Sequence, residues 1–148
     1  MNEQRILIGL RFAMAFIFLW AFFDKVFGLG FATTAEKAWI NGGSPTSGFL
    51  SFATTGPFAP FFKSLAGIAV IDWVFMVGLL FVGLTLALNK YVKWGCIAGA
   101  LMFILMYLAA LPPVNNPIVD DHIIYILVLA LIFVRSKERL SDFGKREG

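Results

Sequence analysis

Cysteine, histidine and charged side chains are all scarce in this chain. The one cysteine, Cys96, cannot form a disulfide within the chain, and no Cys-x-x-Cys motif is present for thiol exchange. The one histidine, His122, excludes a haem held by two histidines of one chain and argues against a conventional zinc site. Charged residues make up 14% of the sequence, against about 25% in soluble domains. We therefore expect neither a bound metal nor a haem. The low share of charged residues further indicates that the chain lies in lipid and not in water.

Long apolar segments fill most of the 148 residues, and 59% of all residues are hydrophobic. Segments 6–23, 65–88 and 94–111 carry at most one charge each, and a helix of ~20 apolar residues crosses a bilayer core of ~30 Å. A fourth segment, 117–134, is long enough but begins with Asp120, Asp121 and His122. The sequence predicts one domain, an all-α integral membrane protein built as a four-transmembrane-helix bundle. The expected spans are about 5–25, 65–88, 92–111 and 117–135, with an outer loop at 26–64 and a cytoplasmic tail at 136–148.

Basic residues gather at the ends of the apolar segments and form no nucleic-acid surface. They precede the first segment, fill the connection between the second and third, and follow the fourth: Arg5, Lys90, Lys93, Arg135, Lys137, Arg139, Lys145 and Arg146. The connection 112–116 has no Lys or Arg. By the positive-inside rule, both termini and the Lys90–Lys93 turn are cytoplasmic, and the plasma (inner) membrane is the expected location.

The outer loop is polar at its turns and aromatic between them. Thr33 and Glu36 fit a capping box, which predicts a short helix that ends at Gly42-Gly43. Its aromatic residues favour short interfacial or re-entrant helices; they are Trp39, Phe49, Phe52, Phe58, Phe61 and Phe62. Farther along, Asn116 as N-cap and Pro117 at the first position predict the start of the fourth helix.

Ionisable side chains from four separate segments fall in the outer half of the predicted membrane. They are Asp24, Lys25, Asp72, Asp121 and His122. Asp72 would lie about 10 Å below the outer end of its span at 1.5 Å per residue. An ionisable group inside a span is expensive and suggests function, although Lys25, His122 or an arginine could pair with Asp72 structurally. Lys25 could also reach the headgroups, and His122 could be merely hydrogen-bonded.

The tryptophans admit two interpretations. Trp20, Trp39, Trp73 and Trp94 fit a belt at the membrane interface. Trp73 beside Asp72, and Trp20 one turn from Asp24, could instead form the wall of a site for a flat aromatic ligand. For these two residues the choice stays open.

Several of these motifs together resemble the DoxX/DoxD family. They are Trp20 with Asp24-Lys25, Trp39-x-x-Gly42, Gly43-Ser-Pro-Thr-Ser-Gly-Phe-Leu50, Gly56-Pro-Phe-Ala59, Leu65-Ala-Gly67, and Asn115-Asn-Pro117 with Asp121-His122. The likeness is strongest to the DoxD-type membrane subunit of thiosulfate:quinone oxidoreductase. It implies a four-helix membrane bundle, quinone as the diffusible electron acceptor, oxidation of thiosulfate to tetrathionate on the outer side, and a separate DoxA-like partner.

The residues and the resemblance together define an expected site below the outer loop. We expect Asp24, Asp72, Asp121 and His122 to be catalytic. The expected substrate-binding residues are Lys25, Trp20, Trp39, Trp73, Asn115 and Asn116. Two other functions stay open: a non-catalytic membrane scaffold for soluble redox or detoxifying partners, and a small proton-coupled transporter. Lipid and quinone are the expected partners, and a homo-oligomer is possible.

Overall fold

The computed structural model describes the backbone of residues 3–114 and 116–146, and the side chains of these residues up to Ser136. This part of the chain contains helices and no strand. Four long helices dominate: α1 (Glu3–Phe27), α3 (Ala69–Leu88), α4 (Val92–Ala109) and α5 (Asp121–Arg146). Short pieces lie between α1 and α3: η1 (Ala35–Lys37), η2 (Trp39–Asn41), η3 (Phe49–Ala53) and α2 (Ala59–Ser64). The all-helical prediction is confirmed for the described residues.

Three of the long helices, α1, α3 and α4, are long and apolar enough to cross a membrane. They match the first three predicted spans to within a few residues. Their outward faces are apolar as well; Phe16 on α1 is 63% exposed and Val74 on α3 is 67% exposed. Helices that are hydrophobic on all sides suit a lipid environment. The fourth span is not among these candidates, because α5 combines an apolar stretch of about 18 Å (residues 123–134) with charged ends.

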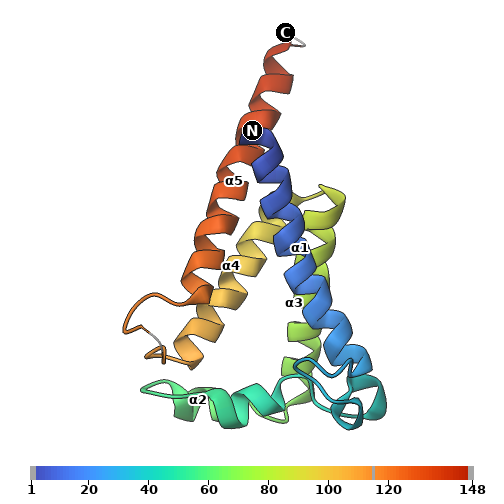
Figure 1. Ribbon diagram of the computed structural model, residues 1–148, viewed down its shortest axis with the longest axis vertical. Helices are drawn as coiled ribbons and strands as arrows, with labels where there is room; N and C mark the ends of the chain where they lie inside the picture. The colour runs from blue at the N-terminus through green and yellow to red at the C-terminus, as the bar shows by residue number, and fades with distance from the viewer. Residues whose placement is uncertain (1–2, 115, 147–148) are drawn as a thin grey trace.

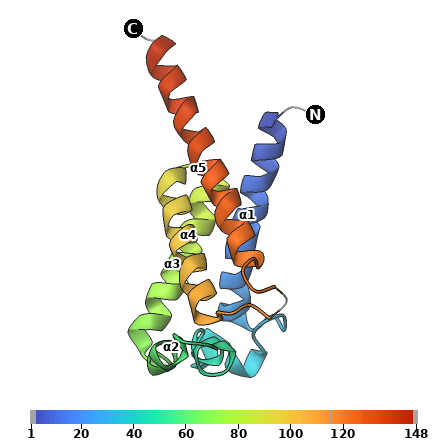
Figure 2. The same cartoon turned by 90° about the vertical axis from the view of Figure 1, so that its left-hand side faces the viewer.

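The long helices pack in chain order, with α1 along α3, α3 along α4, and α4 along α5 (Figures 1 and 2). The start of α1, the α3–α4 turn and the late part of α5 lie towards one end. The segment between α1 and α3 lies at the opposite end, where α2 runs across the ends of the long helices (Figure 1). Their shared core is buried; its members include Phe18, Met76, Leu86, Phe103 and Leu129.

The predicted start of α5 is wrong by four residues. The helix begins at Asp121, and Asp120 Oδ1 accepts a hydrogen bond from the Ile123 amide (3.2 Å), as an N-cap does. The Asn116 side chain instead accepts bonds from the Ile118 amide (2.9 Å) and the Val119 amide (3.0 Å). Asn116 therefore closes a turn before the helix.

The segment between α1 and α3 is more irregular than the predicted single helix. Two 3-10 turns, η1 and η2, replace that helix. The residue directly before η1 is Thr34 and not the predicted Thr33, and Thr33 forms no capping box with Glu36. Instead, a hydrogen bond with the Thr34 side chain lowers the pKa of Glu36 below its usual value. The predicted stop at Gly42 is confirmed, since this residue ends η2 with a left-handed φ of 85°.

Two glycines mark close contacts between segments. Gly56 has a φ of +69°, and a Cβ there would lie 1.8 Å from the Leu111 carbonyl oxygen. Gly95 on α4 faces α3, where a Cβ would lie 2.1 Å from Thr85 Oγ1. Gly95 and Gly99 both pack inside the chain, so the Gly-x-x-x-Gly pattern serves the contact between α4 and its neighbouring helices.

Candidate functional site

Asp72 lies in the first turn of α3, nearer to the helix end than the sequence suggested. The predicted span began at residue 65, but α2 ends at Ser64 and α3 begins only at Ala69. The expected depth of about 10 Å is therefore wrong, because residues 65–68 form a connection and no helical turn. Asp72 is nevertheless buried, with 7% of its surface exposed.

Residues 28–68, between α1 and α3, are named the outer segment after the loop predicted there. Among the described residues, this segment and no basic side chain provides the hydrogen bonds that Asp72 receives. Its Oδ1 accepts from the Ser44 hydroxyl (2.8 Å), the Thr46 hydroxyl (2.6 Å) and the Thr46 amide (3.2 Å). The Ser44-Pro-Thr46 turn is thereby tied to the start of α3. A buried carboxyl group needs such donors, since burial without them costs several kcal/mol.

Asp24 has the same role at the end of α1. It is 1% exposed, and its two oxygens accept from the Phe31 amide (3.1 Å) and the Ala32 amide (2.9 Å). The chain leaves α1 at Gly28, turns, and returns its backbone to this carboxyl group. Asp24 and Asp72 thus hold two different parts of the outer segment against the ends of α1 and α3.

Aromatic side chains pack in pairs near these two aspartates. Trp39 of η2 packs edge-on against Trp73, with ring centres 4.6 Å apart, and Trp20 packs edge-on against Phe31 at 5.0 Å. The Lys25 ammonium lies 5.9 Å from the centre of the Phe75 ring, within range of a cation–π contact. The structure therefore places Trp20, Trp39, Trp73 and Lys25 at the same end of the α1–α3 pair.

His122 belongs to a separate group at the start of α5. Its Nδ1 lies 2.6 Å from Asp120 Oδ2, and its ring packs edge-on near Phe103 on α4, with centres 6.0 Å apart. Burial raises the pKa of Asp120, but hydrogen bonds from His122 and from the Ile123 amide outweigh it, so the pKa lies below its usual value. The side chain of His122 is 25% exposed and that of Asp120 is 22% exposed. This pair remains within reach of a ligand.

A cavity of about 350 Å³ adjoins the pair. Apolar residues of the α4–α5 connection line it together with the three polar residues: Ala110, Pro113, Val114, Val119, Asp120, Asp121 and His122. None of the residues that line it belongs to the group around Asp24 and Asp72. The predicted site is therefore divided between two places, the outer segment on α1 and α3, and the α4–α5 connection.

Asp120 is the residue that the sequence interpretation left out of the site. The histidine was expected beside Asp121, but Asp121 is exposed and Asp120 makes the contact. The N-cap position explains this, since a capping side chain folds back over the first turn, where the second helical residue is His122. Of the other predicted residues, Asn116 is used in its local turn, and Asn115 lies outside the described residues.

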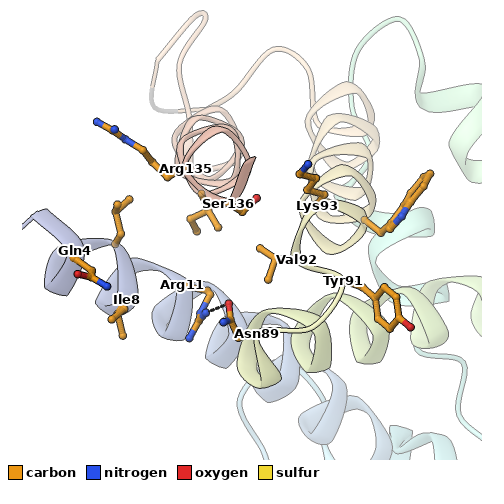
Figure 3. Close-up of a pocket in the computed structure, with 12 residues that line it drawn as sticks. Gln4, Ile8, Arg11, Asn89, Tyr91, Val92, Lys93, Arg135 and Ser136 are labelled. Carbon is orange, nitrogen blue, oxygen red and sulfur yellow. Dashed lines mark hydrogen bonds between the residues drawn. The ribbon is translucent and has the colours of Figure 1, made fainter. Parts of the chain in front are cut away.

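A second cavity, of about 500 Å³, lies at the opposite end, between α1, the α3–α4 turn, α4 and α5 (Figure 3). Arg11, Lys93 and Arg135 line it, together with Asn89, which accepts a hydrogen bond from the Arg11 guanidinium. No pattern in the sequence joined these three residues, because each comes from a different helix.

Comparison with known proteins leaves the geometry as the basis for function: no family model, no curated protein and no solved structure matches this chain.

Proposed function

We propose that this chain is the membrane subunit of an oxidoreductase of DoxX/DoxD type, which passes electrons from thiosulfate or a related small sulfur compound to membrane quinone. The observation that carries the proposal is the His122–Asp120 pair, 2.6 Å apart, on a cavity lined mainly by apolar residues. In this proposal α5 is the fourth membrane helix of a bundle in the plasma membrane. Both termini are cytoplasmic, and the cavity opens on the outer side.

The pair suits proton transfer to a quinone carbonyl. Reduction of a quinone to a quinol takes two electrons and two protons. Histidine exchanges protons near neutral pH, and a carboxylate on Nδ1 orients the ring so that Nε2 meets the ligand. Pro113, Val114 and Val119 supply the apolar surface that a quinone ring needs.

The sulfur reaction provides the electrons. Two thiosulfate ions join through a new sulfur–sulfur bond to give tetrathionate, and the two electrons released reduce one quinone. Lys25 is the basic residue assigned to thiosulfate, at the outer end of α1. Because Asp24 and Asp72 accept hydrogen bonds from amides and hydroxyls of the outer segment, they are positioning residues in this proposal: they hold that segment against the ends of α1 and α3.

The position of α5 supports its role as a fourth span. Its apolar part, 123–134, lies beside α4 between His122 and Arg135. Arg135 can extend its charge towards the headgroups, which adds length to the apolar part of the helix. Arg135 Nη2 also lies 2.6 Å from Glu3 Oε1, which ties α5 to the start of α1 at that end.

A scaffold function is the second candidate, and exposed apolar side chains at the outer end favour it. Phe52 is 88% exposed, Phe61 62%, Val114 97% and Ile118 68%. Such side chains suit the membrane interface, but they would equally suit a docked soluble partner. A scaffold needs no proton-carrying pair, so the two functions differ in what His122 does. A proton-coupled carrier would need polar groups along a path through both leaflets.

The test is quinone reduction by the purified chain in lipid nanodiscs, followed by absorbance after thiosulfate is added. His122→Gln and Asp120→Asn should each abolish most turnover while helix content is unchanged. Glu36→Gln is the control, since it also replaces a carboxylate by an amide, on an exposed residue that does not line the cavity, and it should retain turnover. If the folded wild type reduces no quinone, even with its co-purified partners present, the oxidoreductase proposal fails and the scaffold replaces it.

A further inference from the structure

The cavity between the start of α1, the α3–α4 turn and the middle of α5 combines positive charge with apolar walls (Figure 3). Every charged residue among the described residues that line it is basic: Arg11 from α1, Lys93 from α4 and Arg135 from α5. Its volume of about 500 Å³ is in the range of small-ligand sites. The cavity thus favours an anion.

The three basic residues have different positions. The Arg11 guanidinium donates to Asn89 Oδ1, which fixes it beside the α3–α4 turn, where Asn89 has a left-handed φ of 57°. Arg135 of α5 is bound to the carboxylate of Glu3, at the start of α1. Lys93 takes part in none of the ion pairs found among the described side chains. Arg11 and Lys93 are therefore the residues that would hold the anion.

The apolar walls indicate what the anion is attached to. Leu7, Val92 and Ile132 line the same cavity as the basic groups. Trp94 and Tyr91 stand at its edge, 64% and 76% exposed, as aromatic residues at a membrane interface do. A free phosphate ion would gain nothing from these walls, whereas a phospholipid would place its phosphate on the cations and its first methylenes on the apolar side chains.

We infer that this cavity binds the phosphate of an anionic phospholipid headgroup. Basic pockets between membrane helices, on the side of the positive termini, are known to take such headgroups. The site is independent of the proposed oxidoreductase function, because it lies at the opposite end from His122. The bound lipid would join the start of α1 to α4 and α5 across the cavity that all three helices line.

The experiment is native mass spectrometry of the detergent-purified chain with equimolar phosphatidylglycerol and phosphatidylcholine of identical acyl chains. The wild type should retain phosphatidylglycerol preferentially. Lys93→Gln and Arg11→Gln should each weaken its retention about fivefold, since one basic group near the membrane surface contributes roughly that much. Arg11→Lys should retain binding. Lys63→Gln is the matched control, because it removes one exposed cation from α2 at the other end.

Three results would overturn the inference. One is equal retention of the two lipids by the wild type. Another is an equal loss in Lys63→Gln and Lys93→Gln, which would mean a general effect of charge. The third is displacement of the lipid by millimolar inorganic phosphate, which would make the site one for free phosphate. Lys93→Gln keeps the test decisive if Arg11→Gln fails to fold through loss of the Asn89 contact.

Discussion

The two buried carboxyl groups should each control a different part of the outer segment. Asp72 Oδ1 accepts three hydrogen bonds from Ser44 and Thr46. A bond to a charged acceptor contributes about 1.5–3 kcal/mol and a neutral one about 0.5–1.5 kcal/mol. Asp72→Asn keeps the acceptor oxygen but lowers the strength of all three bonds. Because Ser44 is only half-buried and water can replace part of its bond, we expect a loss of about 2 kcal/mol in local stability.

Hydrogen exchange measures this loss directly, since the Thr46 amide is itself one of the three donors. A loss of about 2 kcal/mol corresponds to roughly 30-fold faster exchange of that amide, if exchange follows local opening. Asp72→Ala should have a larger effect, about 4 kcal/mol, because it leaves the buried amide and hydroxyl of Thr46 without their acceptor. Asp121→Asn, the same change at an exposed aspartate, should leave the exchange of Thr46 unchanged.

The reciprocal experiment uses Asp24. Asp24→Asn should accelerate exchange of the Phe31 and Ala32 amides, which donate to that carboxyl group, and leave Thr46 protected. Asp72→Asn should do the reverse. If either variant exposes both sets of amides equally, the outer segment opens as one unit, and the assignment of separate anchors is refuted. Unchanged exchange of Thr46 in Asp72→Asn would refute it as well.

Three further predictions concern contacts between segments and the start of α5. Gly56→Ala should lower the thermal unfolding temperature strongly, because its Cβ would overlap a backbone oxygen at positive φ, whereas Gly48→Ala, with open space around it and a φ of −60°, should be nearly neutral. Gly95→Ala should destabilise the packing of α4 on α3, while Gly9→Ala, which also has open space, should stabilise α1 by about 0.5–1 kcal/mol; thermal unfolding in lipid compares them. The pKa of Asp120 is lowered, so its ionised form stabilises the first turn of α5. This stabilisation should be fully present above the ordinary aspartate pKa of about 4, and it should be lost as the pH falls through the folded pKa. Asp120→Asn should therefore accelerate amide exchange in that turn at neutral pH and not in acid.

The long helices could be predicted from the sequence because their signal is local. A run of apolar residues specifies a membrane helix without reference to the rest of the chain, and α1, α3 and α4 appear close to where these runs lie. The fourth helix was misplaced because two local signals competed. Asn116-Pro117 and Asp120 both fit a helix start, and the structure uses Asp120.

The outer segment could not be predicted in detail because contacts distant in sequence determine it. The turn at Ser44–Thr46 is bound by Asp72, more than twenty residues later, and the backbone at 31–32 is bound by Asp24. Local capping rules consider only residues a few positions apart, so they could not identify these partners. The same limit explains the cavity of Arg11 and Lys93, since no spacing along the chain relates a residue of α1 to one of α4.

The burial of an aspartate in a membrane protein is usually taken as evidence of a catalytic or transport role, because the cost of burial must have a reason. Here the reason is visible for both buried aspartates: each carboxyl group is matched by donors from the outer segment, and an uncharged side chain could not accept these bonds as strongly. Burial therefore gives no reason to assign catalysis to Asp24 and Asp72, and the less buried pair, Asp120 and His122, is the better candidate. Asp120 contacts His122 and also caps α5, and both residues adjoin a cavity, so of the two it is His122 that can act on a ligand while the start of the helix stays in place. For that reason the loss of turnover expected in His122→Gln should come without a loss of stability, while Asp72→Asn should lose activity only as far as the outer segment opens.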